Sequence, residues 1–527
     1  MTLSRRRFLQ AAGGLLVAAP AASCSLSEVG GVTGVLLESE LELPEPFRVP
    51  LPTPPVLAPS HQDETTDYYE IVQRVGQQEI VPGTTTRVWG YEGTFPGPTL
   101  VSRSGRRTVV RHRNELPVPT VAHLHGGRTP ADSDGYPIDL VLPAGGGTAR
   151  SYGHHADMVG DVRHGVRDYV YPLKQRAATL WYHDHRMDFT APAVWRGLAG
   201  FHLVHDDEEE ALGLPSGERD VALMICDRSF AADGSFRYPA RDPSLTGEPG
   251  VTDEYMDGVL GDVTLVNGAP WPVLDVSASL YRFRILNASN ARRMELALDR
   301  DDGEDEGEND APFVQIGSDG GLLGAPVRHR SIPIAQAERF DVLLDFSAHS
   351  PGTEITMVDR LADGPTEQVL RFRVTGPGDG AAARVPERLA DMAEFESLHE
   401  ADATITRTFS FERAGERDGV EMWTVNGELF DPERMDADPV AGSTEIWELH
   451  SDPAHPIHLH VVPFKVLSRE EEDPKPTDAG WKDTIDLVEG ERARILVRFD
   501  AYPGRYVFHC HNLEHEDMAM MANFEIR

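Results

Sequence analysis

Short apolar runs broken by glycine and proline form the main pattern from Tyr68 to the C-terminus. β-Branched and aromatic residues alternate with polar ones in these runs, as at residues 86–91, 281–286 and 444–449. The sequence contains no helical heptads, no glycine-rich phosphate loop and no nucleophile elbow. Alternation over short segments between turn residues is typical of β-sandwiches, so the pattern predicts an all-β protein.

Changes in composition divide the chain into segments. At 527 residues it is too long for one ordinary core. The acidic run at 206–210 and the glycine-rich run at 376–380 both look like linkers. We therefore expect a proline-rich extended arm followed by three β domains, at residues 25–60, 61–207, 215–376 and 385–527.

The first 24 residues have the pattern of an export signal. Ser4-Arg5-Arg6-Arg7-Phe8-Leu9 is a twin-arginine motif, and the apolar run after it is too short to span a membrane stably. This predicts export by the twin-arginine machinery to an extracellular, cell-surface or periplasmic location. Residues 21–24 resemble a lipobox, so Cys24 is either a lipid-anchored N-terminus or an incidental residue near a plain cleavage site.

The charge balance limits the possible partners. Acidic residues number 86 against 49 basic ones, and the net charge is -37. Such a surface repels nucleic acid and anionic membranes. It also suits a halophilic protein, although a GC-rich genome explains the preference for arginine over lysine equally well. Cys24, Cys226 and Cys510 are the only cysteines, and no disulfide is predicted.

The C-terminal segment 509–520 carries the most informative chemistry. On a strand, His509 and His511 face one way and Cys510 faces the other. A turn after the strand would return His515 and Met520 to the sulfur. With one further imidazole, these groups make the ligand set of an electron-transfer copper. The alternative is a metal-free strand with a buried cysteine.

Ten of the 21 histidines fall into four compact groups. Each His-x-His pair places two imidazoles on one face of a strand. His455 lies at an odd offset from His458 and His460, so it can point toward Cys510 instead. Eight histidines then remain, which suits a cluster of three coppers: His123, His125, His183, His185, His458, His460, His509 and His511.

With these groups, the chain resembles the multicopper oxidases, especially the branch of bacterial spore-coat laccases and bilirubin oxidases. The resemblance covers roughly residues 45–527 and includes the motifs at 95–99, 316–321 and 480–484. It implies three consecutive cupredoxin-like Greek-key domains, with four copper ions. Three of these coppers would form a cluster between the first and third domains.

The resemblance also implies a role for each ligand. The type 1 copper would be bound by His455, Cys510, His515 and Met520, and the type 2 copper by His123 and His458. The type 3 pair would be bound by His125, His183, His185, His460, His509 and His511. Glu516 and Asp134 match acids that family members use near the cluster, where reduction of dioxygen consumes protons. For Asp134, a turn-forming carboxylate is the alternative.

The expected activity is that of an exported laccase-like oxidase. A phenol or aromatic amine would dock near His455, and its electron would pass through Cys510 to His509 or His511. Dioxygen would be reduced to water. The short segment 467–480 suggests an open type 1 site, and no methionine-rich insert typical of cuprous oxidases is present. The alternatives are an oxidase of Cu(I) or Mn(II) and a non-catalytic electron carrier.

Overall fold

The computed structural model describes residues 33–148, 160–300, 311–378, 384–417 and 419–527. All of them belong to one compact unit, residues 31–527. The predicted twin-arginine motif and Cys24 lie outside the described residues, as do His154 and His155. Within the described part of the chain, no helix is both long and apolar enough to cross a membrane.

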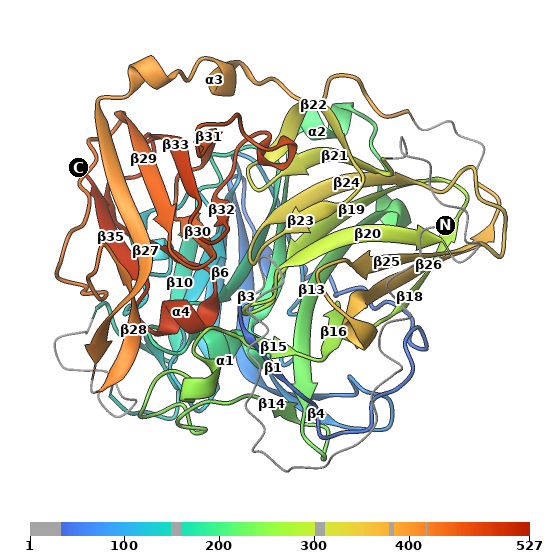
Figure 1. The fold of residues 1–527 in the computed structure, drawn as a ribbon, viewed down its shortest axis with the longest axis horizontal. Coiled ribbons are helices and arrows are strands. Elements are labelled where there is room, and N and C mark those ends of the chain that lie inside the picture. Colours follow the sequence, from blue (N-terminus) through green and yellow to red (C-terminus); the bar gives the residue numbers. More distant parts are fainter. Residues whose placement is uncertain (1–32, 149–159, 301–310, 379–383, 418) are drawn as a thin grey trace, which may run out of the picture. The chain divides into compact units, whose positions relative to one another are not determined.

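The strands fall into three consecutive pairs of sheets (Figure 1). The N-terminal pair begins with a sheet of order β10-β6-β3-β2, with β4 beside β3. Its strands are β2 (His61–Gln62), β3 (Thr66–Gln78), β4 (Thr86–Tyr91), β6 (Arg107–Asn114) and β10 (Val166–Tyr171). The facing sheet has the order β5-β12-β11-β7 and comprises β5 (Leu100–Arg103), β7 (Ala122–His125), β11 (Ala178–Asp184) and β12 (Ala199–His205).

Strand β6 shows why these residues form a sandwich. Thr108, Val110, His112 and Asn114 are buried, while Arg107, Arg111 and Arg113 between them are exposed. This period of two places one side of the strand in the core. The same alternation was the basis for predicting an all-β fold, which the structure confirms.

The middle pair contains the strands between residues 220 and 376 except β15 (Val259–Gly261), which pairs with β1 (Val35–Leu37) instead. One sheet has the order β17-β16-β13-β19-β24-β21-β22, with β14 beside β13, and the other has the order β18-β26-β25-β20-β23. The first comprises β13 (Asp220–Phe230), β14 (Phe236–Arg237), β16 (Val263–Val266), β17 (Ala269–Pro270), β19 (Leu280–Asn287), β21 (Phe313–Ser318), β22 (Gly321–His329) and β24 (Arg339–Asp345). The second comprises β18 (Val273–Ser277), β20 (Met294–Arg300), β23 (Ile332–Ile334), β25 (Glu354–Asp359) and β26 (Gln368–Gly376).

The C-terminal pair packs β28-β27-β29-β33-β31 against β32-β30-β34-β35. The first sheet comprises β27 (Ile405–Arg417), β28 (Val420–Val425), β29 (Thr444–Ser451), β31 (Phe464–Arg469) and β33 (Arg492–Arg498). The second comprises β30 (His455–Leu459), β32 (Thr484–Leu487), β34 (Gly504–Cys510) and β35 (Met521–Ile526). Trp447, Phe499, Phe508 and Phe524 pack between them. The short helix α4 (Leu513–Asp517) follows β34 directly.

The predicted arm and the acidic run both contact the sheets. Strand β1 (Val35–Leu37) pairs in parallel with β15 (Val259–Gly261). Part of the acidic run forms helix α2 (Asp207–Ala211), in which Glu209 is buried. Glu209 accepts hydrogen bonds from Arg282 at 2.6 Å and Arg284 at 3.0 Å, and two buried guanidinium groups need such a counter-charge.

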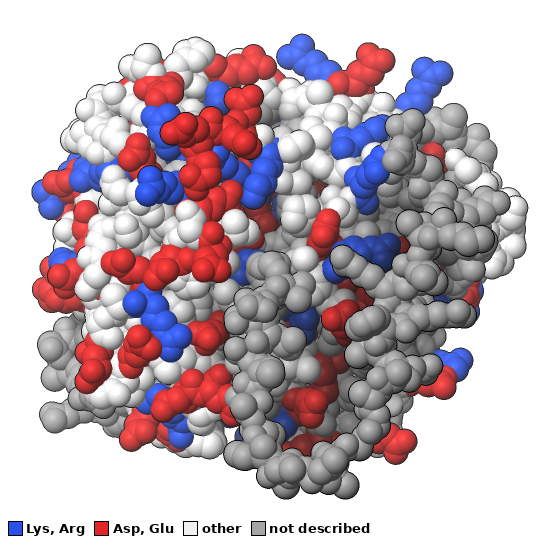
Figure 2. All heavy atoms as spheres, in the orientation of Figure 1, with Lys and Arg blue, Asp and Glu red and all other residues white. Residues whose placement is uncertain are grey.

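On the surface, acidic and basic side chains are intermixed over the described part of the face in Figure 2. Several arginines are paired with carboxylates there or elsewhere on the surface, such as Arg111 with Asp168 at 2.7 Å. Exposed pairs of this kind contribute little to stability individually. The excess of acidic groups therefore bears on solubility and partners more than on the fold.

Candidate metal centres

Neighbouring strands bring Cys510 together with two histidines. Strands β30 and β34 pair so that Ile457 lies opposite Cys510, which places His455 near the sulfur. The Sγ atom of Cys510 lies 3.4 Å from Nδ1 of His455 and 3.7 Å from Nδ1 of His515, and the two Nδ1 atoms are 3.1 Å apart. All three side chains are fully buried. Three converging donor atoms at these separations fit one tightly bound metal ion.

Helix α4 and the residues after it complete this site. Met520 is fully buried, its backbone N–H donates to the carbonyl of His515 at 3.0 Å, and its carbonyl accepts from Cys510 at 3.1 Å. Burial raises the pKa of the Cys510 thiol, so a bound cation would be needed to favour the thiolate. The structure thus places the four predicted ligands of this site in one buried region.

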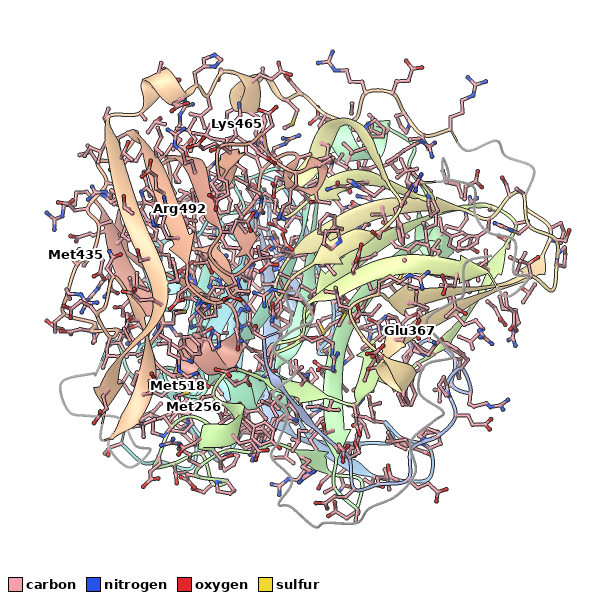
Figure 3. The ribbon with its side chains drawn as sticks, in the orientation of Figure 1. Met256, Glu367, Met435, Lys465, Arg492 and Met518 are labelled. Carbon is pink, nitrogen blue, oxygen red and sulfur yellow. The ribbon has the colours of Figure 1, made fainter. Side chains whose placement is uncertain are left out.

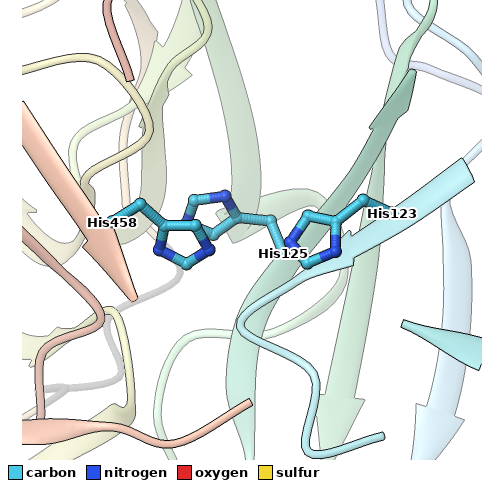
Figure 4. Close-up of side chains that lie close together, drawn as sticks. All are labelled: His123, His125 and His458. Carbon is cyan, nitrogen blue, oxygen red and sulfur yellow. The ribbon is translucent and has the colours of Figure 1, made fainter. Parts of the chain in front are cut away.

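The other eight predicted histidines also meet, between the N-terminal and C-terminal pairs of sheets. Two groups of three are formed by His125, His183 and His511 and by His185, His460 and His509. Within each group the candidate ligand atoms lie within 4.8 Å of one another. His123 and His458 form a third group with His125, which is shared, and the rings of His125 and His458 stack at 3.6 Å (Figure 4).

Hydrogen bonds determine which nitrogen each ring presents. Nδ1 of His123, His183, His458 and His509 donates to a backbone carbonyl, at 2.6–2.9 Å. Each of these rings therefore keeps a lone pair on Nε2. His125 is the exception, because its Nε2 faces a carboxylate oxygen of Asp483 at 3.1 Å and its Nδ1 is left for a ligand.

The remaining lone pairs converge without partners of their own. Nε2 of His509 lies 3.2 Å from Nε2 of both His185 and His460. Among the described residues, Nε2 of His123 and Nε2 of His458 have no hydrogen-bond partner. Burial lowers the pKa of four of these imidazoles, which keeps them neutral: His123, His185, His458 and His460. Facing lone pairs on neutral rings repel unless a cation lies between them, so these residues fit bound copper.

Both predicted acids contact this cluster. Asp134 accepts a hydrogen bond from Nδ1 of His460 at 2.7 Å through Oδ2, and its backbone carbonyl accepts from His123. Burial raises the pKa of the Asp134 carboxyl to about 8. Glu516 lies with one oxygen 3.2 Å from Nδ1 of His509 and accepts a hydrogen bond from the hydroxyl of Thr190 at 2.6 Å.

The two histidines of the Cys-His site are covered by other parts of the chain. His455 and His515 are both 0 % exposed. The indole of Trp423 stacks on His515 at 3.8 Å, and Nε2 of His515 donates to the carbonyl of Asp257 at 3.2 Å. These residues come from β28 and from the chain before β15, so nothing in the length of segment 467–480 could have indicated this cover.

Two further groups were missed or left without a role. Trp423 carries no sequence signal that separates it from other core tryptophans. Asp483 belongs to the motif 480–484, which marked the resemblance but was assigned no function. It contacts His125 with its side chain and His458 with its backbone carbonyl. Two histidines outside the predicted ligand set lie away from the cluster: His164 is exposed, and His329 is buried with Nε2 2.8 Å from the side-chain oxygen of Gln315.

Comparisons with known proteins agree with this geometry. Two family models, both described as multicopper oxidase, match residues 74–158 with 163–209 and residues 400–527. The laccase of Bacillus subtilis (strain 168) is 36% identical over 537 residues, which cover 92% of this chain and 98% of that protein. This chain belongs to the multicopper oxidase family.

Two other relatives extend the match. The bilirubin oxidase of Albifimbria verrucaria is 34% identical over 510 residues, covering 91% of this multicopper oxidase and 81% of the relative. A crystal structure of a multi-copper oxidase from Pediococcus acidilactici has a TM-score of 0.78 and 31% identity, and it covers 95% of both chains. The resemblance inferred from the sequence is confirmed. The protein is a copper-dependent oxidoreductase that uses dioxygen as its acceptor.

Proposed function

We propose that this multicopper oxidase is laccase-like, coupling the one-electron oxidation of small phenols or aromatic amines to the four-electron reduction of dioxygen to water. The observation that carries the proposal is the arrangement around Cys510. This residue belongs to the buried Cys-His site, while His509 and His511 beside it belong to different three-histidine groups. Relatives named laccase support the same reading.

The proposed copper assignment follows the predicted one. His455, Cys510, His515 and Met520 would hold the type 1 copper, and His123 and His458 the type 2 copper. The two three-histidine groups, formed by His125, His183 and His511 and by His185, His460 and His509, would each hold one type 3 copper. When bound, these four coppers would supply single-electron acceptance from the donor and four-electron delivery to dioxygen.

The chain itself supplies a covalent path for electrons and two acids that transfer protons. The backbone joins Cys510 directly to His509 and His511, so only covalent bonds separate the sulfur from both three-histidine groups. Asp134 beside His460 and Glu516 beside His509 would pass protons toward the cluster through their carboxylate oxygens. Burial of both acids excludes bulk water and favours directed proton transfer over leakage.

Copper loading tests this proposal. The purified protein should hold about four coppers per chain, show an intense blue band and consume dioxygen with a phenolic donor. His509→Gln should stop oxygen uptake and leave the blue band, because His509 lies outside the Cys-His site. Normal oxygen uptake by this variant would overturn the cluster assignment. A single blue copper without oxygen uptake would leave only the electron-carrier function.

One cavity favours a second candidate, an oxidase of Cu(I). A depression of about 280 Å³ beside the Cys-His site is lined by Met422, Met518 and Glu248 among others. The backbone N–H of Met518 donates to the carbonyl of His515, and Met518 lies at the end of α4 (Figure 3). Thioethers are soft ligands suited to Cu(I). Faster turnover of Cu(I) than of phenols, lost in Met518→Leu, would favour this candidate over the laccase.

Export and salt adaptation are part of the proposal. The twin-arginine motif supports export with the metal centres already folded, and the net charge of -37 supports activity in high salt. Replacing Arg5 and Arg6 by lysine should retain the full-length protein inside the cell. Labelling with a radioactive fatty acid, in the wild type and in Cys24→Ser, would separate a lipid anchor from free secretion.

A further inference from the structure

One buried guanidinium joins all three pairs of sheets. Arg339 begins β24 of the middle pair and is 1% exposed. It donates to the carbonyl of Thr179 in the N-terminal pair at 3.1 Å and to those of Ala337 and Asp319 at 2.9 and 3.1 Å. Its two terminal nitrogens also bind both carboxylate oxygens of Asp483, with Nη1 at 2.7 Å from Oδ1. Every N–H direction of the fork is therefore used.

Asp483 in turn controls two rings of the histidine cluster. Its Oδ1 accepts from Nε2 of His125 at 3.1 Å, and its backbone carbonyl accepts from Nδ1 of His458 at 2.8 Å. These two rings stack face to face (Figure 4). Asp483 thus orients them oppositely, so that His125 keeps Nδ1 and His458 keeps Nε2 free for a ligand. Unlike His125, four rings of the cluster donate Nδ1 to a backbone carbonyl: those of His123, His183, His458 and His509.

The carboxylate can do this only while its rotation is restricted. A bidentate arginine fork fixes both oxygens in one plane, so Oδ1 stays directed at His125. A second acid, Asp319, holds the backbone on both sides of the contact. Its carboxylate accepts from the backbone N–H of Arg339 at 2.8 Å and from that of Asp483 at 3.2 Å. It also pairs with the buried Lys482 at 2.9 Å.

We propose that Arg339 is a positioning residue of the trinuclear site. It orients Asp483 so that His125 offers Nδ1 as its ligand atom. The middle pair of sheets contains none of the predicted copper ligands, yet through Arg339 it sets the geometry where His125 and His458 meet. The inference rests on the proposed copper assignment. It adds a residue outside the ligand set that orients one of the ligands.

Arg339 could instead have a purely structural role, linking the pairs of sheets. Arg284 provides a matched control for that role. Arg284 is 1% exposed and lies on β19, the strand beside β24. It binds Asp220 at 2.8 Å and Glu209 at 3.0 Å, and it reaches the hydroxyl of Thr179 at 3.4 Å. It therefore joins the middle pair to the N-terminal pair from a buried position, and it contacts none of the predicted ligands.

The experiment compares Arg339→Lys with Arg284→Lys in the copper-loaded, full-length protein. Lysine keeps the charge and loses the fork. Loss of an outer-shell partner typically weakens metal binding by about 10- to 100-fold. Arg339→Lys should therefore release the type 3 copper assigned to His125 to a chelator about 10- to 100-fold more readily than the wild type does. The blue band of the Cys510 site should be unchanged.

Arg284→Lys should keep the copper retention of the wild type, whatever its unfolding temperature. Asp483→Asn should reproduce the copper loss of Arg339→Lys, and the double variant should lose no more than either single one, because the two residues act as one unit. Equal copper retention in Arg339→Lys and Arg284→Lys would overturn the inference. Equal copper loss in both would also overturn it, by showing a purely structural tie. If the proposed function itself fails, the wild-type protein will already lack copper at these histidines, before any variant is compared.

Discussion

Replacing Asp134 by asparagine separates its two possible roles at the cluster. Asp134 is 2 % exposed, and its Oδ2 lies 2.7 Å from Nδ1 of His460. Thr129 donates to the other oxygen at 3.0 Å. The side chain is therefore buried against the cluster, although its backbone also closes the turn at residues 131–133. It acts as a proton donor, as a support for His460, or as both.

The size of the effect distinguishes these roles. As a support, the change replaces the carboxyl acceptor of His460 by an amide acceptor, a loss of about 1–2 kcal/mol, or about 5- to 30-fold in copper retention. As a proton donor, the change removes general acid catalysis, which contributes about 10²- to 10⁴-fold. We expect oxygen turnover by Asp134→Asn to fall by about 100-fold or more, with a much smaller effect on copper content.

Stopped-flow absorbance separates the two half-reactions. Anaerobic bleaching of the blue band by a phenol should proceed at the wild-type rate, because the Cys510 site does not contact Asp134. Recovery of the band on mixing with dioxygen should be slow. Asp132→Asn is the matched control, since Asp132 lies on the same turn, is exposed and contacts none of the histidines in the described structure. Recovery at the wild-type rate in Asp134→Asn would refute the proton role.

Three further predictions concern access to His515, a buried counter-charge and the pH dependence of stability. Trp423→Ala should uncover His515, raising kcat/KM for bulky phenols relative to small inorganic reductants, and should cost about 3–5 kcal/mol of stability by urea unfolding; an unchanged preference would mean that Trp423 does not limit access. Glu209→Ala removes a counter-charge from both Arg282 and Arg284, so it should lower the free energy of unfolding by about 3–5 kcal/mol without changing the copper content. Loss of copper in this variant would contradict the prediction. Burial raises the pKa of Asp359 to about 6, so the folded state binds its proton more tightly than the unfolded state does. The free energy of unfolding should therefore fall by about 3 kcal/mol as pH rises from about 4 to about 7. Asp359→Asn should remove this part of the pH dependence of unfolding, and an identical pH profile would count against it.

The sequence was sufficient for features that depend on local geometry. Alternation of side chains along a strand is a property of two or three neighbouring residues. It placed Cys510 opposite His509 and His511, and it separated His455 from His458. The all-β fold follows from the same alternation repeated along the chain. The ligand identities could be predicted because each histidine pair is encoded within a few positions.

Only the tertiary structure decided how those local units combine. Shared strand faces did not show that His509 and His511 contribute to different groups, or that His185 meets His509 across 324 positions of sequence. The burial of His515 under Trp423 depends on strands that are remote in the chain. The same holds for the contact of Arg339 with Asp483, 144 positions apart. Such contacts are set by how the sheets pack, and no alternation pattern within one strand encodes that packing.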